Sequence, residues 1–267
     1  MGYKMKSNIK RILVIADQHV TSEEEDHPSY LLTREFARRY QPDEVVDLGD
    51  LMSWNVVSHY NKQKLRALED GRIKREYESG NRRLDEWQEA VPNTPWVLLE
   101  GNHDRWIEDY IDLHPETEGL LEMPSNLHLG ERGIEWVKLD QQPVKVGKMN
   151  LLHGWWCGEG AAKKHVWKIG GNVIFGHVHK TSTFYRSIYD SDDMQVGHSI
   201  GCLTTTRPAY QKARITDHNN GFALLYIDPD DGRFGVYNIV ILRNSFIIGS
   251  KRYSLKELSG GRMEKEL

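Results

Sequence analysis

The sequence predicts an α/β fold, and three of its features support this. Short apolar runs that suit buried strands alternate with stretches of helical spacing in the first half of the chain. Several of these runs end directly in Asp, Asn or His. After about residue 135 the pattern changes to closely spaced strands, which indicates a second sheet. With 267 residues, the chain is long enough for one large α/β domain.

Composition narrows the class of protein. The formal net charge of -4 argues against a protein that binds duplex DNA mainly through bulk positive charge. The two cysteines, Cys157 and Cys202, form neither a disulfide framework nor a metal-ligand spacing, which favours a reducing compartment. No apolar run approaches the ~18 residues of a membrane span. We therefore expect a soluble, cytoplasmic protein that has no contact with a membrane.

In the first half, each predicted strand ends in polar residues. The run from Arg11 is continuously apolar, as in a strand covered on both faces, and Gln18 and His19 come directly after it. The next strand ends in Gly49 and Asp50. The predicted strands are 11–17, 44–48 and 97–99, and the predicted helices are 28–40 and 106–113.

Residues 53–92 differ from their surroundings and are predicted to be a helical insertion. Apolar side chains recur there at helical spacing among many charges, and we expect two or three helices broken near Gly71 and Gly80. A packing layer over the sheet is the favoured interpretation, because acidic residues alternate with the basic ones. The alternative is a cap that offers positive charge to a polyanion through Lys62, Lys64, Arg66, Arg72, Lys74 and Arg75.

The second half is predicted to contain mainly strands. The segments 136–139, 144–146 and 149–152 are assigned to the second sheet, followed by a helix at 161–168 and a strand at 172–175. Further strands at 184–188, 196–202, 222–227, 235–242 and 246–248 are expected mostly to complete that sheet. Asp228–Gly232 has the residues of a tight turn, so its flanking strands should pair as a hairpin. We predict one domain over residues 1–250 and a charged, frayed tail over 251–267.

Five predicted strand ends carry polar groups that suit metal ions. Because ligand sites in open α/β sheets form at the carboxyl ends of strands, these groups are expected to meet in one site. Carboxylate, imidazole and amide ligands suit divalent ions such as Mn, Fe or Zn, and the absence of thiolate argues against a structural zinc site. The clusters are Asp17-Gln18-His19, Gly49-Asp50, Gly101-Asn102-His103-Asp104, His153-Gly154 and Gly176-His177-Val178-His179.

In this order the five clusters resemble the motifs D-x-H, G-D, G-N-H-D, H-G and G-H-x-H of the calcineurin-like metallophosphoesterase superfamily. The resemblance covers Asp17 to His179, about three-fifths of the chain. It implies a four-layer αββα sandwich of two mixed β-sheets flanked by helices. It also implies two divalent metal ions, with manganese first and iron, zinc, nickel or magnesium as alternatives. The implied ligands of the first ion are Asp17, His19 and His179, those of the second are Asn102, His153 and His177, and Asp50 bridges both.

The resemblance also implies a mechanism. A metal-bridging hydroxide would attack the phosphorus atom while His103 assists the leaving oxygen. Asp104 would orient the imidazole of His103 as the second catalytic residue. Substrate contacts are expected from Asn102, His103 and Arg105.

The substrate class is open to several interpretations. The motifs of protein Ser/Thr phosphatases look like G-D-x-x-D-R-G and G-N-H-E. In this chain Asp50 is followed by Leu-Met-Ser-Trp, and position 104 is Asp where those motifs have Glu. A phosphodiesterase of the bacterial or phage type, acting on a nucleotide-like phosphodiester, is therefore favoured. The alternatives are a nuclease of the Mre11 branch acting on DNA or RNA, a phosphomonoesterase, and a non-catalytic metal-binding interaction domain. The oligomeric state is open.

Other polar and aromatic residues fall outside the motifs. Trp155 and Trp156 follow His153 directly; we favour packing between the sheets for them, with stacking on a nucleobase as the alternative. Seven histidines match no ligand position, and of these His165 and His198 are expected nearest the site. The seven are His27, His59, His114, His128, His165, His198 and His218.

Overall fold

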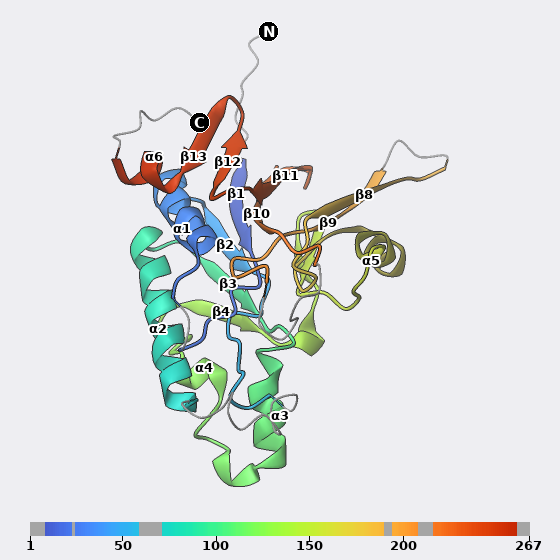
Figure 1. Ribbon diagram of the computed structural model, residues 1–267. Helices are drawn as coiled ribbons and strands as arrows, with labels where there is room; N and C mark the ends of the chain where they lie inside the picture. Colours follow the sequence, from blue (N-terminus) through green and yellow to red (C-terminus); the bar gives the residue numbers. More distant parts are fainter. Residues whose placement is uncertain (1–8, 23–24, 59–70, 190–193, 208–215, 261–267) are drawn as a thin grey trace.

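The computed structural model consists of two mixed β-sheets packed face to face, with helices on both outer sides (Figure 1). The structure describes residues 9–22, 25–58, 71–189, 194–207 and 216–260. The predicted four-layer αββα sandwich is thereby confirmed. Within the described residues, no helix is both long and apolar enough to span a membrane.

The first sheet has six strands in the order β11-β10-β1-β2-β3-β4. The strands from β1 to β4 are parallel to one another, whereas β10 pairs antiparallel with both β1 and β11. Their bounds are β1 Lys10–Ile15, β2 Glu44–Asp47, β3 Trp96–Leu99, β4 Ile134–Val137, β10 Asn220–Ile227 and β11 Phe234–Ile241.

The second sheet has five strands in the order β5-β6-β7-β9-β8. The three central strands are parallel, and both edge strands pair antiparallel. Their bounds are β5 Val144–Val146, β6 Met149–Leu152, β7 Asn172–Phe175, β8 Ser182–Ser187 and β9 Met194–Ser199.

Three buried apolar layers separate the sheets and helices. Successive residues of β1 point to opposite faces, so Ile12 and Val14 pack against the second sheet while Leu13 and Ile15 pack beneath the helices. This explains why the run of residues that forms β1 is continuously apolar.

Figure 1 shows α1 and α2 outside the first sheet and α5 outside the second. The helices are α1 Pro28–Tyr40, α2 Ile73–Ala90, α3 Arg105–Leu113, α4 Met123–Asn126, α5 Ala161–Ile169 and α6 Leu255–Gly260, with 3-10 turns at Pro115–Thr117 and Leu139–Gln141.

The structure corrects the assignment of strands to sheets. Trp136 lies on β4, which pairs with β3 in the first sheet and not in the second. The hairpin predicted around the Asp228–Gly232 turn forms, as β10 and β11, but it extends the first sheet. The expectation that the strands after the last ligand mostly complete the second sheet is therefore wrong, because hydrogen bonding to β1 recruits β10 to the other layer.

The chain after residue 250 is not frayed throughout. The strands β12 Ser245–Ile248 and β13 Lys251–Ser254 form a small antiparallel pair, and α6 follows. Tyr253 and Leu258 are each only 2% exposed and pack with Phe36 in the layer beneath the helices. The prediction of a frayed tail is therefore wrong for Lys251–Gly260; residues 261–267 lie outside the described residues.

The 53–92 segment contributes a packing layer over the described part of its length. Tyr77, Leu84 and Trp87 of α2 are buried against the first sheet, whereas Lys74 is exposed and forms an ion pair with Glu78. Helix α2 runs through Gly80 without a break, so the break expected there is wrong. The glycine is explained by close packing, because a Cβ atom at this position would lie 2.8 Å from both Leu127 and Met52. Residues 59–70, with Lys62, Lys64 and Arg66, lie outside the described residues.

Candidate metal centre

The carboxyl ends of five strands meet at one edge of the sandwich and bring the predicted ligands together. Asp17 and His19 follow β1, Asp50 follows β2, and Asn102 follows β3. From the second sheet, His153 comes directly after β6, and His177 and His179 follow β7. A site shared between two sheets explains why its members are far apart in the sequence.

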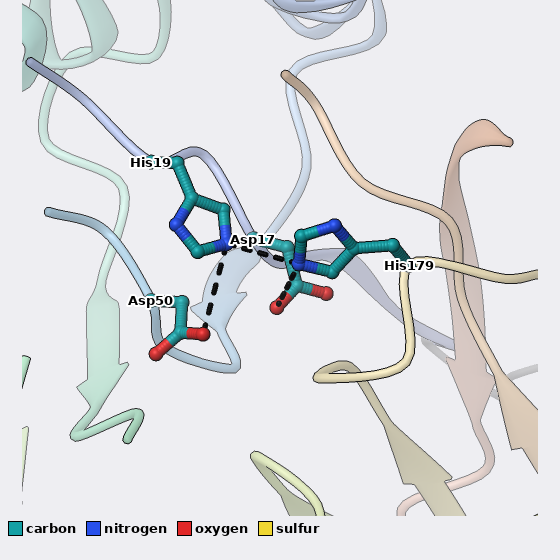
Figure 2. A group of neighbouring side chains, drawn as sticks. All are labelled: Asp17, His19, Asp50 and His179. Carbon is teal, nitrogen blue, oxygen red and sulfur yellow. Dashed lines mark hydrogen bonds and ion pairs between the residues drawn. The ribbon is translucent and has the colours of Figure 1, made fainter. Parts of the chain in front are cut away.

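The first group of ligand atoms comes from Asp17, His19, Asp50 and His179, which offer atoms within 4.8 Å of one another. Figure 2 shows both imidazoles turned toward the two carboxylates. The Nε2 atoms of His19 and His179 are 2.9 Å apart, and Nε2 of His179 lies 3.7 Å from Oδ1 of Asp17. Since the acceptor nitrogens converge on one point, the group suits a single divalent cation.

The second group adjoins the first and shares Asp50 with it. Asp50, His153 and His177 also offer atoms within 4.8 Å of one another. Nε2 of His153 lies 3.4 Å from Oδ2 of Asp50 and 3.0 Å from Oδ1 of Asn102. The same Oδ2 atom is 3.7 Å from Nε2 of His19 in the first group. Asp50 is thus placed between the two groups, as a bridging carboxylate must be.

The backbone at the site adopts conformations that are rare for residues with a side chain. Five of the candidate ligands have positive φ, a conformation that costs free energy and is concentrated at functional sites. These are Asp17 (52°), His19 (47°), Asp50 (53°), His177 (69°) and His179 (52°). Main-chain hydrogen bonds from Asp17 to Gly49 and from His19 to Asp50 hold the first two loops together.

Gly101 is required by close approach of two loops. A Cβ atom at this position would lie 2.2 Å from both the backbone nitrogen and Oδ1 of Asp50. Only glycine lets the loop after β3 pass so near the shared carboxylate. The backbone N–H of His103 then donates to Oδ1 of Asp50 at 2.7 Å.

The electrostatics of the site fit divalent cations. Burial lowers the pKa of His19 well below its usual value, that of His177 to about 4 and that of His179 to about 3, so these imidazoles are neutral and can ligate a metal. Burial acts to raise the pKa of Asp50, but the nearby His153, His103 and His19 hold that pKa well below the usual value. An ionised carboxylate between neutral imidazoles is the donor set that such cations bind.

His153 differs from the other imidazoles. Burial acts to lower its pKa, but Asp50, together with Asp17 and Asp104, raises that pKa to about 9. In the metal-free protein a proton therefore occupies the place of a cation beside Asp50. A metal ion that binds His153 must displace this proton.

The structure corrects the role expected for Asp104. Its buried carboxylate accepts hydrogen bonds from the backbone N–H groups of Gly101, Leu51 and Met52, whereas the His103 ring uses Nδ1 to bond to the carbonyl oxygen of Ser53. The prediction that Asp104 orients the imidazole of His103 is therefore wrong. The Asp104 carboxylate instead accepts from Leu51 and Met52 in the loop after β2 and from Gly101 in the loop after β3, and so ties the two loops together.

The His103 ring has other neighbours, which sequence reasoning missed. Its Nδ1 donates to the backbone carbonyl oxygen of Ser53 at 3.0 Å. Trp106 packs on the ring, with centroids 3.9 Å apart, and the His19 ring meets it edge-on at 4.5 Å. Trp106 follows His103 by three residues at the start of α3, and side chains with this spacing are neighbours on a helix. The sequence therefore contained a signal that Trp106 could lie over the His103 ring.

Arg105, expected to contact substrate, lies at the rim of the site. Its guanidinium forms an ion pair with Asp109 at 3.5 Å and lies 4.0 Å from Glu100. It has no contact with the candidate ligands among the described residues. A role in substrate binding stays a prediction.

The loop after β6 carries exposed groups beside the second ligand group. Trp155 is 40% exposed, so the expectation that it packs between the sheets is wrong; Trp156 meets it edge-on and is partly buried. The backbone N–H of Trp155 donates to buried His165, which stacks on Phe175. The thiol of Cys157, which was not predicted to approach the site, lies 3.0 Å from Nε2 of His177.

Among the described residues, the remaining histidines divide into structural residues and two neighbours of the site. His27 caps α1 by accepting from Ser29, His198 contacts Thr183 within the second sheet, and His114 and His128 pair with glutamates at the surface. His165 lies near the site as expected, whereas His198 does not. His218 was not expected near the site, but its ring centroid lies 4.9 Å from that of His179. His59 lies outside the described residues.

The family model described as calcineurin-like phosphoesterase matches residues 10–181, which include all seven candidate metal ligands. The chain is similar to two curated phage proteins, each called Gene 54 protein. It is 28% identical over 236 residues to that of Mycobacterium phage L5 and 28% identical over 233 residues to that of Mycobacterium phage D29. Each match covers 82% of this chain and 89% of the relative.

Among solved structures, the chain is similar to a crystal structure of Chaetomium thermophilum Vps29. The match has a TM-score of 0.47 and 12% sequence identity, and it covers 92% of this chain and 98% of the other.

Proposed function

Because this chain belongs to the calcineurin-like phosphoesterase family, we propose that it is a metal-dependent phosphodiesterase acting on a nucleotide-like phosphodiester. The observation that carries the proposal is the position of Asp50 between two complete groups of ligand atoms. Family membership supports a metal-dependent phosphoester hydrolase. The preference for a diester is our own inference and needs the experiment below.

The residues present fit two divalent ions. Asp17, His19 and His179 would hold the first, Asn102, His153 and His177 the second, and Asp50 would contact both. When bound, such a pair supplies Lewis acidity to a phosphoryl oxygen and a water nucleophile at neutral pH. Manganese is our first choice because carboxylate and amide oxygens suit Mn²⁺, and the imidazole ligands make iron, zinc and nickel the alternatives.

His103 would donate a proton to the leaving oxygen. Its Nδ1 donates to the carbonyl oxygen of Ser53, so the ring is fixed and Nε2 is the atom left for proton exchange. The packing of Trp106 on the ring further restricts its orientation. A proton donor held in this way contributes to general acid catalysis without being a metal ligand.

A nucleotide-like substrate is supported by the loop after His153. An exposed Trp beside a catalytic centre is unusual for a residue type that is mostly buried, and its ring can stack on a base. Lys164 places its ammonium group 5.2 Å from the ring centroid of Trp156 and adds positive charge to the same rim. These features equally suit a single-stranded nucleic acid, so a nuclease is the second candidate.

A substrate panel tests the proposal. Metal-free protein is reconstituted with Mn²⁺ and assayed on bis-p-nitrophenyl phosphate, p-nitrophenyl phosphate, cyclic nucleotides and single-stranded oligonucleotides. We expect the diester to be hydrolysed faster than the monoester, and a cyclic nucleotide faster than an oligonucleotide. Preference for the monoester would overturn the diesterase assignment, and preference for the oligonucleotide would favour the nuclease.

A pair of variants tests the role of the loop. Trp155→Ala should raise KM for a nucleotide substrate and leave KM for bis-p-nitrophenyl phosphate nearly unchanged, because only the former has a base to stack. Trp167→Ala is the matched control, since Trp167 is also exposed (53%) but lies on α5 and packs with Arg186.

If the metal-loaded wild-type protein hydrolysed none of these substrates, the result would favour the non-catalytic interaction domain.

A further inference from the structure

His218 is the residue from which a new inference can be drawn, because it lies beside a metal ligand whose outer nitrogen lacks a partner. His179 directs Nε2 toward His19 and Asp17, so Nε2 is the atom that can ligate a metal (Figure 2). A neutral imidazole that ligates through Nε2 carries its proton on Nδ1. Nδ1 of His179 is buried and has no hydrogen-bond partner in the described part of the chain.

Another histidine in the centre satisfies the same requirement. Nδ1 of His153 donates to the backbone carbonyl oxygen of Leu48 at 3.0 Å, which fixes its tautomer and ring orientation. Metal-ligating histidines almost always have such an outer partner. His179 is therefore incomplete as a ligand unless a neighbouring group supplies an acceptor.

His218 is the neighbour that can do so. The centroids of the two rings are 4.9 Å apart, and the rings are tilted by 56°. Nδ1 of His218 is itself buried and without a hydrogen-bond partner among the described residues. Two unpartnered ring nitrogens thus lie on adjacent imidazoles. Because the χ2 torsion of His218 is soft, its ring can turn Nδ1 toward that of His179.

The segment that carries His218 is fastened to the loop that carries His179. The backbone N–H of Asn219 donates to the carbonyl oxygen of His179 at 2.9 Å. The side chain of Asn219 accepts from both the backbone N–H and the hydroxyl of Thr181, and Lys180 forms an ion pair with Asp217. These contacts hold residues 217–219 against residues 179–181, so the two rings stay neighbours.

We propose that His218 is a positioning residue of the first metal site, and that its Nδ1 accepts a hydrogen bond from the Nδ1–H group of His179. His218 is then neutral, with its own proton on Nε2. The bond fixes the tautomer of His179 and aims Nε2 at the metal. The inference rests on the proposed metal centre and extends it to a residue outside the five sequence motifs.

Metal affinity tests this inference separately from catalysis. The full-length protein is stripped of metal and titrated with Mn²⁺ by calorimetry, for the wild type, His218→Asn and His218→Leu. Asn places an amide oxygen near the position of Nδ1 and keeps the acceptor, whereas Leu removes it. Replacing an outer partner of a metal ligand typically weakens binding about 10–100-fold. We expect that loss at one site for His218→Leu, and recovery to within about threefold of wild type for His218→Asn.

His128→Leu is the matched control, because His128 is an exposed histidine that pairs with Glu131 at the surface. Thermal unfolding of the metal-free variants checks that all of them are folded. Wild-type affinity in His218→Leu, or an equal loss in the Asn and Leu variants, would overturn the inference. Failure of the wild-type protein to bind metal would overturn the metal centre, and the role of His218 with it.

Discussion

Nδ1 of His103 donates a hydrogen bond to the backbone carbonyl oxygen of Ser53 across 3.0 Å. Ser53 lies just beyond Asp50, in the loop after β2, whereas His103 lies in the loop after β3. The contact therefore ties His103, the proposed acid, to the loop that carries the shared carboxylate. It fixes the ring without using the side chain of Asp104.

Replacement of His103 should separate catalysis from metal binding. His103→Ala should keep the metal content of the wild type, because the seven candidate ligands remain. Its kcat should fall about 10²–10⁴-fold, the range for loss of a positioned acid or base. Elemental analysis and a hydrolysis assay on the same sample check this. His114→Ala, at an exposed histidine on the surface, is the control. Loss of metal in His103→Ala would show that its role is misassigned.

Replacement of Asp104 should act through stability. Asp104→Ala leaves three backbone N–H donors of a buried turn without their acceptor. We expect the free energy of unfolding to fall by about 3 kcal/mol, since each buried unsatisfied group costs about 1–3 kcal/mol. Urea denaturation of the metal-free protein measures this. Asp109→Ala, at an exposed site, should change it by less than about 0.5 kcal/mol. An unchanged unfolding free energy in Asp104→Ala would contradict the structural role.

Gly101→Ala should damage the metal centre from outside the ligand set. The added Cβ would overlap the backbone nitrogen and Oδ1 of Asp50, so the shared carboxylate must move. We expect a loss of bound metal comparable to that of a ligand variant, measured by elemental analysis. Gly130→Ala is the control, because no atom lies within 4 Å of its Cβ position. Normal metal content in Gly101→Ala would refute the close approach.

Metal binding should release protons near neutral pH. In the metal-free protein Asp50, Asp17 and Asp104 together raise the pKa of His153 to about 9 against the effect of burial, so His153 is protonated at pH 7. Because a metal needs the neutral ring, affinity should rise with pH up to about 9 and level off above it. Calorimetry at pH 7 in buffers of different ionisation enthalpy measures the released protons. A metal-binding enthalpy that does not vary with the buffer would contradict the predicted release of protons.

Five of the candidate ligands could be predicted from the sequence because each lies within three residues of the end of an apolar strand. Asp17, Asp50, Asn102, His153 and His177 lie where the run of strand residues stops, and the carboxyl ends of parallel strands share an edge. Helix α1 was likewise predictable from Pro28 and the helical spacing after it. Local patterns of this kind need no knowledge of the tertiary structure.

Other features depend on long-range contacts and could not be predicted. The sheet to which β4 belongs is decided by hydrogen bonds to β3, about forty residues away, and not by its own residues. Gly80 signals a helix break in sequence but is needed for close packing on Met52. The partners of Asp104 and His218 likewise come from other loops, so only the folded chain shows them.

The bridging role of Asp50 is the centre of the account, and one comparison tests it most directly. Wild-type protein and Asp50→Ala are reconstituted with Mn²⁺, analysed for bound metal and assayed on bis-p-nitrophenyl phosphate. We predict about two metal ions per chain and diester hydrolysis for the wild type, and loss of both in the variant. Full metal content and activity in Asp50→Ala, or no metal and no turnover in the wild type, would contradict the account.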